Sequence, residues 1–229
     1  MSDRIKSDLR RQAVAVNVMS PSKSSVTQSA ILNAATRFLE NRQFRDLTVG
    51  ILMQDAGYSR ATFYQYFIDL HGLMETLLDR IKGQIIDGAQ PWLIGQGDTV
   101  ANLQESLRAL VDVGYDQGFI LKAVADASAS DARLERVWES FLTSFDTLVS
   151  ARIAKDQAAA YTTKFDPSPV AHALNRMDAA VLISSFGQNP KANKDVVLSA
   201  ILRIWISTLY PQHAGKLTSV AGPQPMEQP

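Results

Sequence analysis

The sequence contains no cysteine, carries no net charge and has no long apolar run. The lack of cysteine excludes disulfides, thiolate metal sites and cysteine nucleophiles. No window approaches the roughly 20 apolar residues of a membrane span, and residues 1–25 lack the apolar stretch of a signal peptide. We therefore expect a soluble, cytoplasmic protein that has no membrane partner.

Motifs of common enzyme chemistry are also missing. The chain has no HExxH, no GxSxG, no phosphate-binding loop and no glycine-rich dinucleotide fingerprint. His71, His172 and His213 lie far apart in the sequence, and a surface or hydrogen-bonded role explains each better than a metal-ligand role. We expect no catalytic residue, no metal and no cofactor. An enzyme stays as the first alternative, which turnover of a candidate substrate would revive.

Charge is distributed unevenly although it cancels overall. Residues 1–70 hold nine Lys/Arg against six Asp/Glu, and the remainder holds 14 against 17. This polarity fits a DNA-facing N-terminal end and a neutral-to-acidic body, although an asymmetry of this size is weak evidence. The basic residues before Pro21 form an arm that either touches DNA or is a solvated terminus, and the second explanation is favoured.

Helical spacing of apolar residues runs through almost the whole chain, whereas the period-two alternation of strands is poor. Capping residues and glycines mark most of the ends, and Pro91 with the following glycines predicts a break. The expected helices cover residues 26–41, 48–56, 59–66, 69 to the break at Pro91, 99–117, 119–127, 130–153, 166–187 and 193–209.

The most informative segment is residues 48–67, TVGILMQDAGYSRATFYQYF. Two short helices separated by a turn at Gly57 give the helix-turn-helix arrangement. Outward Arg and Gln side chains can form bidentate bonds to base edges in a major groove, and hydroxyl groups can bond phosphates. On geometry alone, an ordinary helical hairpin explains the pattern equally well. The candidate DNA-binding residues are Thr48, Ser59, Arg60, Ala61, Thr62, Tyr64, Gln65 and Tyr66.

Residues 25–81 resemble the DNA-binding domain of the TetR family, with the order and spacing of its fragments intact. The matching fragments are Ala30–Ala35, Phe44–Val49, Ala56–Ser59, Phe63-Tyr64 and Phe67. The resemblance implies that residues 59–66 form the recognition helix and that Tyr64 contacts phosphate. It also implies an all-α, TetR-like chain with four parts. These are a flexible basic arm (1–24), a three-helix DNA-binding domain (25–70), a helical-bundle domain for ligand binding and dimerisation (71–211) and a disordered tail (212–229).

The segment departs from that family at two places. Gly50-Ile51 stands where acidic residues usually follow the opening threonine, and residues 68–70 replace a Pro-Ser-Lys sequence. The lysine contact to phosphate is therefore missing, and His71 is only a partial substitute. We expect DNA affinity to depend more on Arg60, Thr48 and the N-terminal arm.

In the helical-bundle part of the chain, apolar residues share single helix faces, and two polar residues stand among them. Residues 138, 142, 145 and 149 share one helix face, and Asn175 and Asp178 share a face with Leu182. Such stripes usually belong to a bundle core or a dimer interface. The polar side chains need partners there, which a ligand, an arginine or a second subunit could supply.

Residues 134–210 are similar to the mycobacterial EthR-type repressors of the TetR family, in fragments 173–177, 184–186 and 204–210. In those relatives, aromatic residues line an apolar tunnel and asparagines bond the ligand's polar group. The resemblance implies a small apolar or amphipathic effector here. Asp178 replaces one asparagine, which favours a donor or cationic group, and Leu107 replaces a tryptophan. The implied ligand-binding residues are Leu107, Trp138, Leu142, Phe145, Leu148, Val149, Asn175, Asp178, Leu182 and Trp205.

By the same resemblance, the last two helices pair with their copies to form a homodimer. Such a dimer binds double-stranded DNA at a palindromic operator, with half-sites about one helical turn or a multiple apart. The expected function is a ligand-responsive transcriptional repressor that a bound effector releases from DNA. The second alternative is a protein–protein module that keeps the helix-turn-helix without binding DNA.

Overall fold

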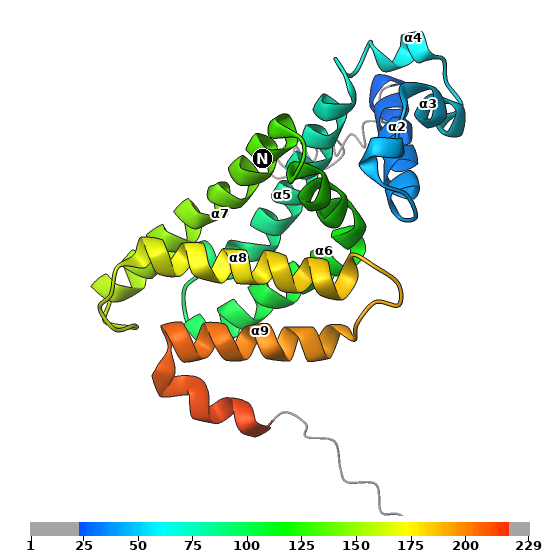
Figure 1. The fold of residues 1–229 in the computed structure, drawn as a ribbon. Coiled ribbons are helices and arrows are strands. Elements are labelled where there is room, and N and C mark those ends of the chain that lie inside the picture. The colour runs from blue at the N-terminus through cyan, green and yellow to red at the C-terminus, as the bar shows by residue number, and fades with distance from the viewer. Residues whose placement is uncertain (1–22, 220–229) are drawn as a thin grey trace, which may run out of the picture.

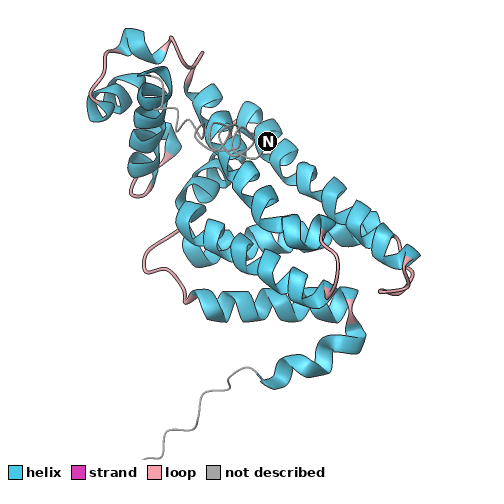
Figure 2. Ribbon diagram, turned by 180° about the vertical axis from the view of Figure 1, so that it is seen from behind, coloured by secondary structure: helices cyan, strands magenta, loops and turns pink. Residues whose placement is uncertain are grey.

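The computed structural model describes residues 23–219, and within this range every regular element is a helix (Figures 1 and 2). The expected all-α fold class is therefore confirmed. None of the helices in this range is long and apolar enough to cross a membrane. The elements are α2 (Lys23–Leu39), η1 (Phe44–Asp46), α3 (Val49–Ala56), α4 (Arg60–Phe63), α5 (Leu70–Ile94), α6 (Thr99–Ser128), α7 (Ala132–Ala158), α8 (Pro167–Phe186), α9 (Lys194–Leu209) and η2 (Pro211–Ser219).

The helices form a small end and a larger body (Figure 1). Helices α2, α3 and α4 make up the small end, and α5 runs from it into the body. There α5, α6 and α7 pack against one another. Helices α8 and α9 lie side by side across the end of the body that is far from α4. The long helix α5 therefore belongs to both parts.

Capping residues set the helix ends where the sequence places them. The Thr48 hydroxyl accepts a hydrogen bond from the Ile51 N–H at 3.2 Å and so begins α3. Gly57 ends the same helix in the left-handed conformation, with φ 78°, which a residue without Cβ adopts freely. Asp166 and Asn193 cap α8 and α9 in the same way as Thr48. These predicted boundaries are confirmed.

The expected break occurs at Gly95, which ends α5, but not at Pro91, because α5 continues through the proline to Ile94. A proline inside a helix normally leaves backbone groups without partners. Here the Ser106 hydroxyl of α6 accepts a hydrogen bond from the Trp92 N–H at 3.1 Å and donates to the Ala89 carbonyl at 3.3 Å. A side chain from a neighbouring helix therefore bonds backbone groups on both sides of the proline.

The two helices expected over 99–117 and 119–127 are one continuous helix, α6. Gly118, which suggested a junction, is instead a place where α8 approaches closely. A Cβ at this position would collide with the backbone of Phe186, and one at Gly114 would collide with the side chain of Leu182. The glycines therefore serve helix packing and do not interrupt the helix.

The termini also differ from expectation. Residues 23 and 24, assigned to the arm, are the start of α2, and the remainder of the basic arm lies outside the described residues. Disorder was expected from residue 212 onward, but Pro211–Ser219 forms the 3-10 helix η2. Residues 220–229 lie outside the described range.

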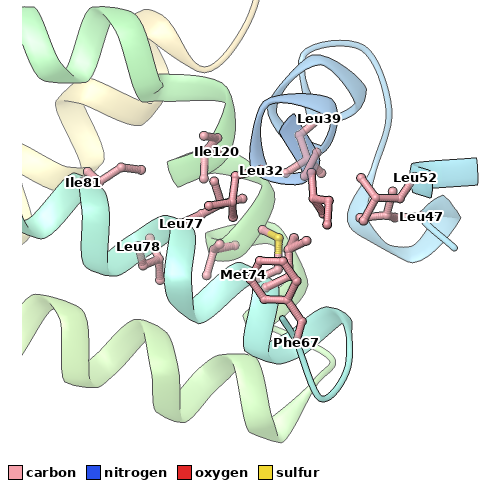
Figure 3. Packing of buried hydrophobic residues seen from close by; sticks show 14 of the residues in the cluster. Leu32, Leu39, Leu47, Leu52, Phe67, Met74, Leu77, Leu78, Ile81 and Ile120 are labelled. Carbon is pink, nitrogen blue, oxygen red and sulfur yellow. The ribbon is translucent and has the colours of Figure 1, made fainter. Parts of the chain in front are cut away.

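Two apolar cores fill the molecule. The first joins the small end to the upper body, and Phe67, Met74, Leu77 and Ile120 meet within it (Figure 3). The second lies deeper in the body, around α8, α9 and the end of α5. Because the first core includes residues of α5, α6 and α7, the small end is packed rigidly onto the body.

Candidate nucleic-acid interface and ligand cavity

The segment expected to read DNA is shorter as a helix than its pattern predicts. Helix α4 spans Arg60–Phe63, whereas an eight-residue rod was expected from Ser59 to Tyr66. Beyond Phe63 the chain tightens, because the Gln65 N–H bonds the Thr62 carbonyl and the Tyr66 N–H bonds the Phe63 carbonyl. The segment is thus one α-helical turn followed by one tighter turn.

Two buried phenylalanines hold this segment against the first core. Phe63 is fully buried and Phe67 nearly so, and their ring centroids lie 5.4 Å apart. The Ser59 hydroxyl begins the helix by accepting a hydrogen bond from the Thr62 N–H at 3.2 Å. The cap and the anchor fix the direction in which the remaining side chains point.

Six of the eight candidate DNA-binding residues are exposed, and two are half-buried. The Thr62 hydroxyl lies 2.9 Å from that of Ser59, and Tyr66 packs against the first core. Tyr64 is 62% exposed, which suits a side chain free to reach a phosphate. The exposed six are Thr48, Ser59, Arg60, Ala61, Tyr64 and Gln65.

Gly50, which stands where the family usually has an acid, lies beside the Arg60 side chain. A Cβ at Gly50 would overlap the Arg60 guanidinium, so glycine makes the space that this side chain occupies. No carboxylate within residues 23–219 forms an ion pair with Arg60. An acidic side chain at position 50 would both block and neutralise it. The departure therefore leaves the exposed Arg60 side chain without an acidic neighbour at position 50.

A narrow apolar cavity of about 90 Å³ lies inside the body. All ten residues that the sequence assigns to ligand binding line it, and they come from α6, α7, α8 and α9. Its walls draw on both cores, since Leu142 belongs to the first and Val149 and Leu182 belong to the second. The cavity therefore lies where the two cores meet.

Asp178 is the one ionisable side chain among the residues that line this cavity. It is 4% exposed, and the indole N–H of Trp205 donates to its two oxygens at 3.1 and 3.2 Å. Burial raises the pKa of the Asp178 carboxyl to about 8 and outweighs the opposite effect of the Trp205 hydrogen bond. The carboxyl is thus neither solvent-facing nor ion-paired.

Asn175 lines the cavity but is already hydrogen-bonded on its outer side. Its amide donates to Asp146 at 2.8 Å, and Asp146 also contacts His172 and Arg176. No group of residues suited to hold a metal ion occurs within residues 23–219. The cavity therefore offers apolar surface, one carboxyl and few other polar groups.

Comparison with known proteins places this architecture in a family. Residues 103–211 match the family model described as "Transcriptional regulator EthR, C-terminal domain". The HTH-type transcriptional regulator EthR of Mycobacterium tuberculosis is 31% identical over 188 residues, which cover 79% of this chain and 86% of the relative. The chain belongs to the TetR family of transcriptional regulators.

Solved structures agree with this TetR-family fold. A putative TetR-family regulator from Syntrophomonas wolfei superposes with a TM-score of 0.71 at 15% identity, covering 88% of this chain and all of that one. The SmeT–triclosan complex gives a TM-score of 0.70 at 15% identity, covering 87% and 99%. At these identities the likeness shows the fold alone.

Sequence reasoning about this TetR-family chain missed the contribution of α5 to the cavity. Ile85, Ala89 and Trp92 line it, at a spacing of four and three. That helical spacing continues through Pro91, and it could have indicated from the sequence that this helix lines the cavity. Phe141 of α7 was also missed, although it neighbours a predicted lining residue.

A buried polar network behind Trp92 was missed entirely. The Trp92 indole donates to the Tyr210 hydroxyl at 2.9 Å, and that hydroxyl donates to Asp156. Asp156 pairs with Arg152, whose guanidinium lies over the Trp92 ring and donates to the Trp92 carbonyl. The network therefore fixes the end of α5 against α7 and the end of α9.

Two crossed contacts join the start of α5 to the start of α7. Asp69 caps α5 and pairs with Arg133, while Asp131 caps α7 and accepts a hydrogen bond from His71 at 2.6 Å. We call these four residues the α5–α7 clasp. His71 is therefore engaged within the protein, contrary to the idea that it replaces the phosphate-binding lysine.

Proposed function

We propose that this protein is a homodimeric repressor that binds a palindromic operator and is released from it by a small ligand. The observation that carries the proposal is that helix α5 connects an outward recognition segment to an internal cavity. Helix α5 begins three residues after Phe67 and also lines the cavity through Ile85 and Trp92. The same rigid element therefore connects the two sites.

DNA readout rests on the exposed side of α4. Arg60 and Gln65 are the residues able to form bidentate bonds to base edges, and Tyr64 reaches phosphate. Thr48, which caps α3, is exposed and can offer its hydroxyl to a phosphate. Sequence specificity is thus assigned to few side chains.

Dimerisation through α8 and α9 is supported by the residues on their outer faces. Ala173, Ala180 and Ser184 are exposed small residues on α8, and Val196 and Ile204 are exposed apolar residues on α9. Small and apolar side chains allow two helix pairs to approach closely and bury area. A symmetric dimer formed there places two α4 segments on one side for two half-sites.

Ligand release follows from the size of the cavity. A volume of about 90 Å³ is well below the roughly 300 Å³ or more of typical ligand pockets. A ligand must therefore widen the space between α5 and α7, whose starts are joined by the α5–α7 clasp. Movement there changes the spacing of the two α4 segments. A coupling of roughly 1–3 kcal/mol would alter DNA affinity about 5–150-fold.

Selection of genomic fragments by the purified protein tests this function. A repressor enriches one short palindrome, and the bound protein has the mass of a dimer or its multiple. Enrichment of no sequence, or a lone subunit in sedimentation, would overturn the proposal in favour of a protein–protein module.

Replacing Arg60 then tests the readout. We expect Arg60→Ala to weaken binding to the selected palindrome by about 1–3 kcal/mol, and random DNA by less, because a base contact is lost. Fluorescence anisotropy with both DNAs measures the difference. Arg108→Ala is the matched control, since Arg108 is an exposed arginine of α6 in the body. An equal loss on both DNAs would remove Arg60 from base recognition.

A further inference from the structure

Asp178 is a buried acid that has no cationic partner among residues 23–219. Within residues 23–219 its hydrogen bonds come from one donor, the Trp205 indole, although a carboxylate can accept about four. The Asp178 residue is also 96% buried, given its exposure of 4%. Burying a carboxyl without full hydrogen bonding is costly, so its presence in an apolar cavity needs an explanation.

Aromatic rings line the same cavity as this carboxyl. The rings of Trp205 and Trp92 meet edge to face, with centroids 5.5 Å apart. Trp138, Phe141 and Phe145 of α7 also line the cavity. The faces of such rings attract cations, with the strongest effect where water is excluded. A carboxyl among aromatic rings therefore suits a positively charged group that carries apolar substituents.

From this arrangement we infer that the cavity selects amphipathic amines, whose protonated nitrogen pairs with Asp178 while the apolar part fills the aromatic space. The inference rests on the proposed function, because it takes this cavity as the effector site. It narrows the effector from small apolar molecules in general to a basic amine with a hydrocarbon or aromatic body.

Charged groups on the neighbouring helices do not already satisfy Asp178. The cavity-lining residues of α5, α6, α7 and α9 include no other ionisable side chain. Arg152 is paired with Asp156 behind Trp92, and Arg176 reaches outward to Glu139 and Asp146. His172 also faces Asp146. An incoming amine would therefore be the cation closest to the Asp178 oxygens.

Protonation gives the inference a second signature. Because burial raises the pKa of the Asp178 carboxyl to about 8, the free protein holds a proton there at neutral pH. Pairing with an ammonium group stabilises the carboxylate, so binding at pH 6 to 7 releases that proton. As the pH is raised toward 8, the affinity for the amine increases by up to about tenfold per pH unit, and above pH 8 it levels off.

The test uses 4-phenylbutylamine and the neutral analogue 4-phenylbutan-1-ol, titrated calorimetrically into the full-length protein. We expect the amine to bind roughly tenfold tighter or more at pH 7.5, with proton release seen as a dependence on buffer ionisation heat. Asp178→Asn keeps the shape and should abolish both the preference and the proton release. Asp126→Asn, which removes an exposed acid of α6, should keep both.

Equal binding of amine and alcohol, binding of neither, or an undiminished amine preference in D178N would overturn the inference. The pH series on the unaltered protein gives a second check that needs no variant, and a flat affinity between pH 6 and 8 would also overturn it. DNA release is measured separately by anisotropy. Release by the alcohol as readily as by the amine would contradict the inference and leave the repressor function standing. Amine binding through Asp178 without any change in DNA affinity would support the inference and contradict the proposed release mechanism.

Discussion

The helix-turn-helix end and the body of the molecule differ in the polarity of their buried side chains. In the described part of the chain, the buried polar residues Ser106, Arg152, Asp156 and Asp178 all lie in the body. The helix-turn-helix end buries apolar side chains, among them Leu52, Met53 and Phe63. An apolar interior packs to one arrangement and holds a recognition segment still. Buried polar groups cost stability and are retained where a site must respond to a ligand or a proton.

The contrast extends to how each end is held together. The DNA-reading end is stabilised by caps and contacts within a short stretch of sequence, such as Ser59 with Thr62 and Thr48 with Ile51. The body is stabilised by contacts between residues far apart, such as Trp92 with Tyr210. The first end is therefore locally determined, and the second depends on the correct assembly of the five helices α5 to α9.

The sharpest test of this contrast is the pH dependence of stability, which should come from the body. Asp178 has a folded-state pKa of about 8, against about 3.9 when unfolded. Between these values the folded protein holds a proton that the unfolded chain has lost. The free energy of unfolding therefore falls as pH rises, by at most about 1.4 kcal/mol per unit, and the loss levels off above pH 8.

Asp178→Asn isolates this effect. We expect the variant to match the parent near pH 4 and to exceed it by several kcal/mol near pH 8, because the asparagine side chain does not ionise. Urea denaturation at a series of pH values gives the difference between the two proteins, in which all other titrating groups cancel. A difference that does not change with pH would show that Asp178 is not desolvated in solution.

The next largest effect should come from the apolar anchor of the DNA-reading end. Phe63 is fully buried, so Phe63→Ala should lower the free energy of unfolding by about 3–5 kcal/mol and weaken DNA binding. Chemical denaturation and anisotropy measure the two losses. The neighbouring Tyr64, 62% exposed, gives the control. Tyr64→Ala should change stability by less than about 0.5 kcal/mol and still weaken DNA binding. Similar destabilisation by both changes would refute the assigned anchor.

The same contrast decides what could be predicted from sequence. The helix-turn-helix was predictable because Thr48, Gly57 and Ser59 act on backbone groups within three residues of themselves. The second helix of the pair begins after Ser59 as predicted but is shorter than predicted, since the tightening after Phe63 has no strong local signal. In the body, the ten residues that the resemblance to the EthR-type repressors implied all lie on the cavity wall, and seven of them also belong to the apolar stripes of α7 and α8 or interrupt them.

What failed in the body was anything that depends on a distant partner. The continuity of α5 through Pro91 requires the hydroxyl of Ser106, 14 residues beyond Trp92. The Arg152–Asp156–Tyr210 network joins helices whose register sequence alone does not fix. Asp178 was recognised as a polar interruption, but its partner Trp205 lies 27 residues away. Long-range pairing of this kind follows from assembled packing and leaves no local periodicity.

A small effect on stability is expected from the α5–α7 clasp, where the two regions meet. The Asp69–Arg133 side chains are 39% and 41% exposed, so solvent screening keeps their pairing to about 0.2–1 kcal/mol. A double-mutant cycle of Asp69→Asn with Arg133→Ala measures it, because asparagine retains the capping acceptor for the Gly72 N–H.

The clasp also has a defined pH window. The Gly72 backbone hydrogen bond, aided by Arg133, lowers the pKa of Asp69, and His71 lowers the pKa of Asp131. Both carboxylates therefore contribute stability above about pH 3.8, and this contribution is lost as the pH falls through their lowered values.

The functional effect of Arg133→Ala should exceed its effect on stability. If movement of α7 reaches α4 through the clasp, the variant binds operator normally but loses much of the ligand-induced decrease in DNA affinity. Anisotropy with and without ligand measures this coupling. Lys122→Ala is the matched control, since it breaks a similarly exposed pair with Asp126 inside α6. If both variants keep the full ligand response, the coupling runs through the shared apolar core of α5, and the clasp serves only to join the two helix starts.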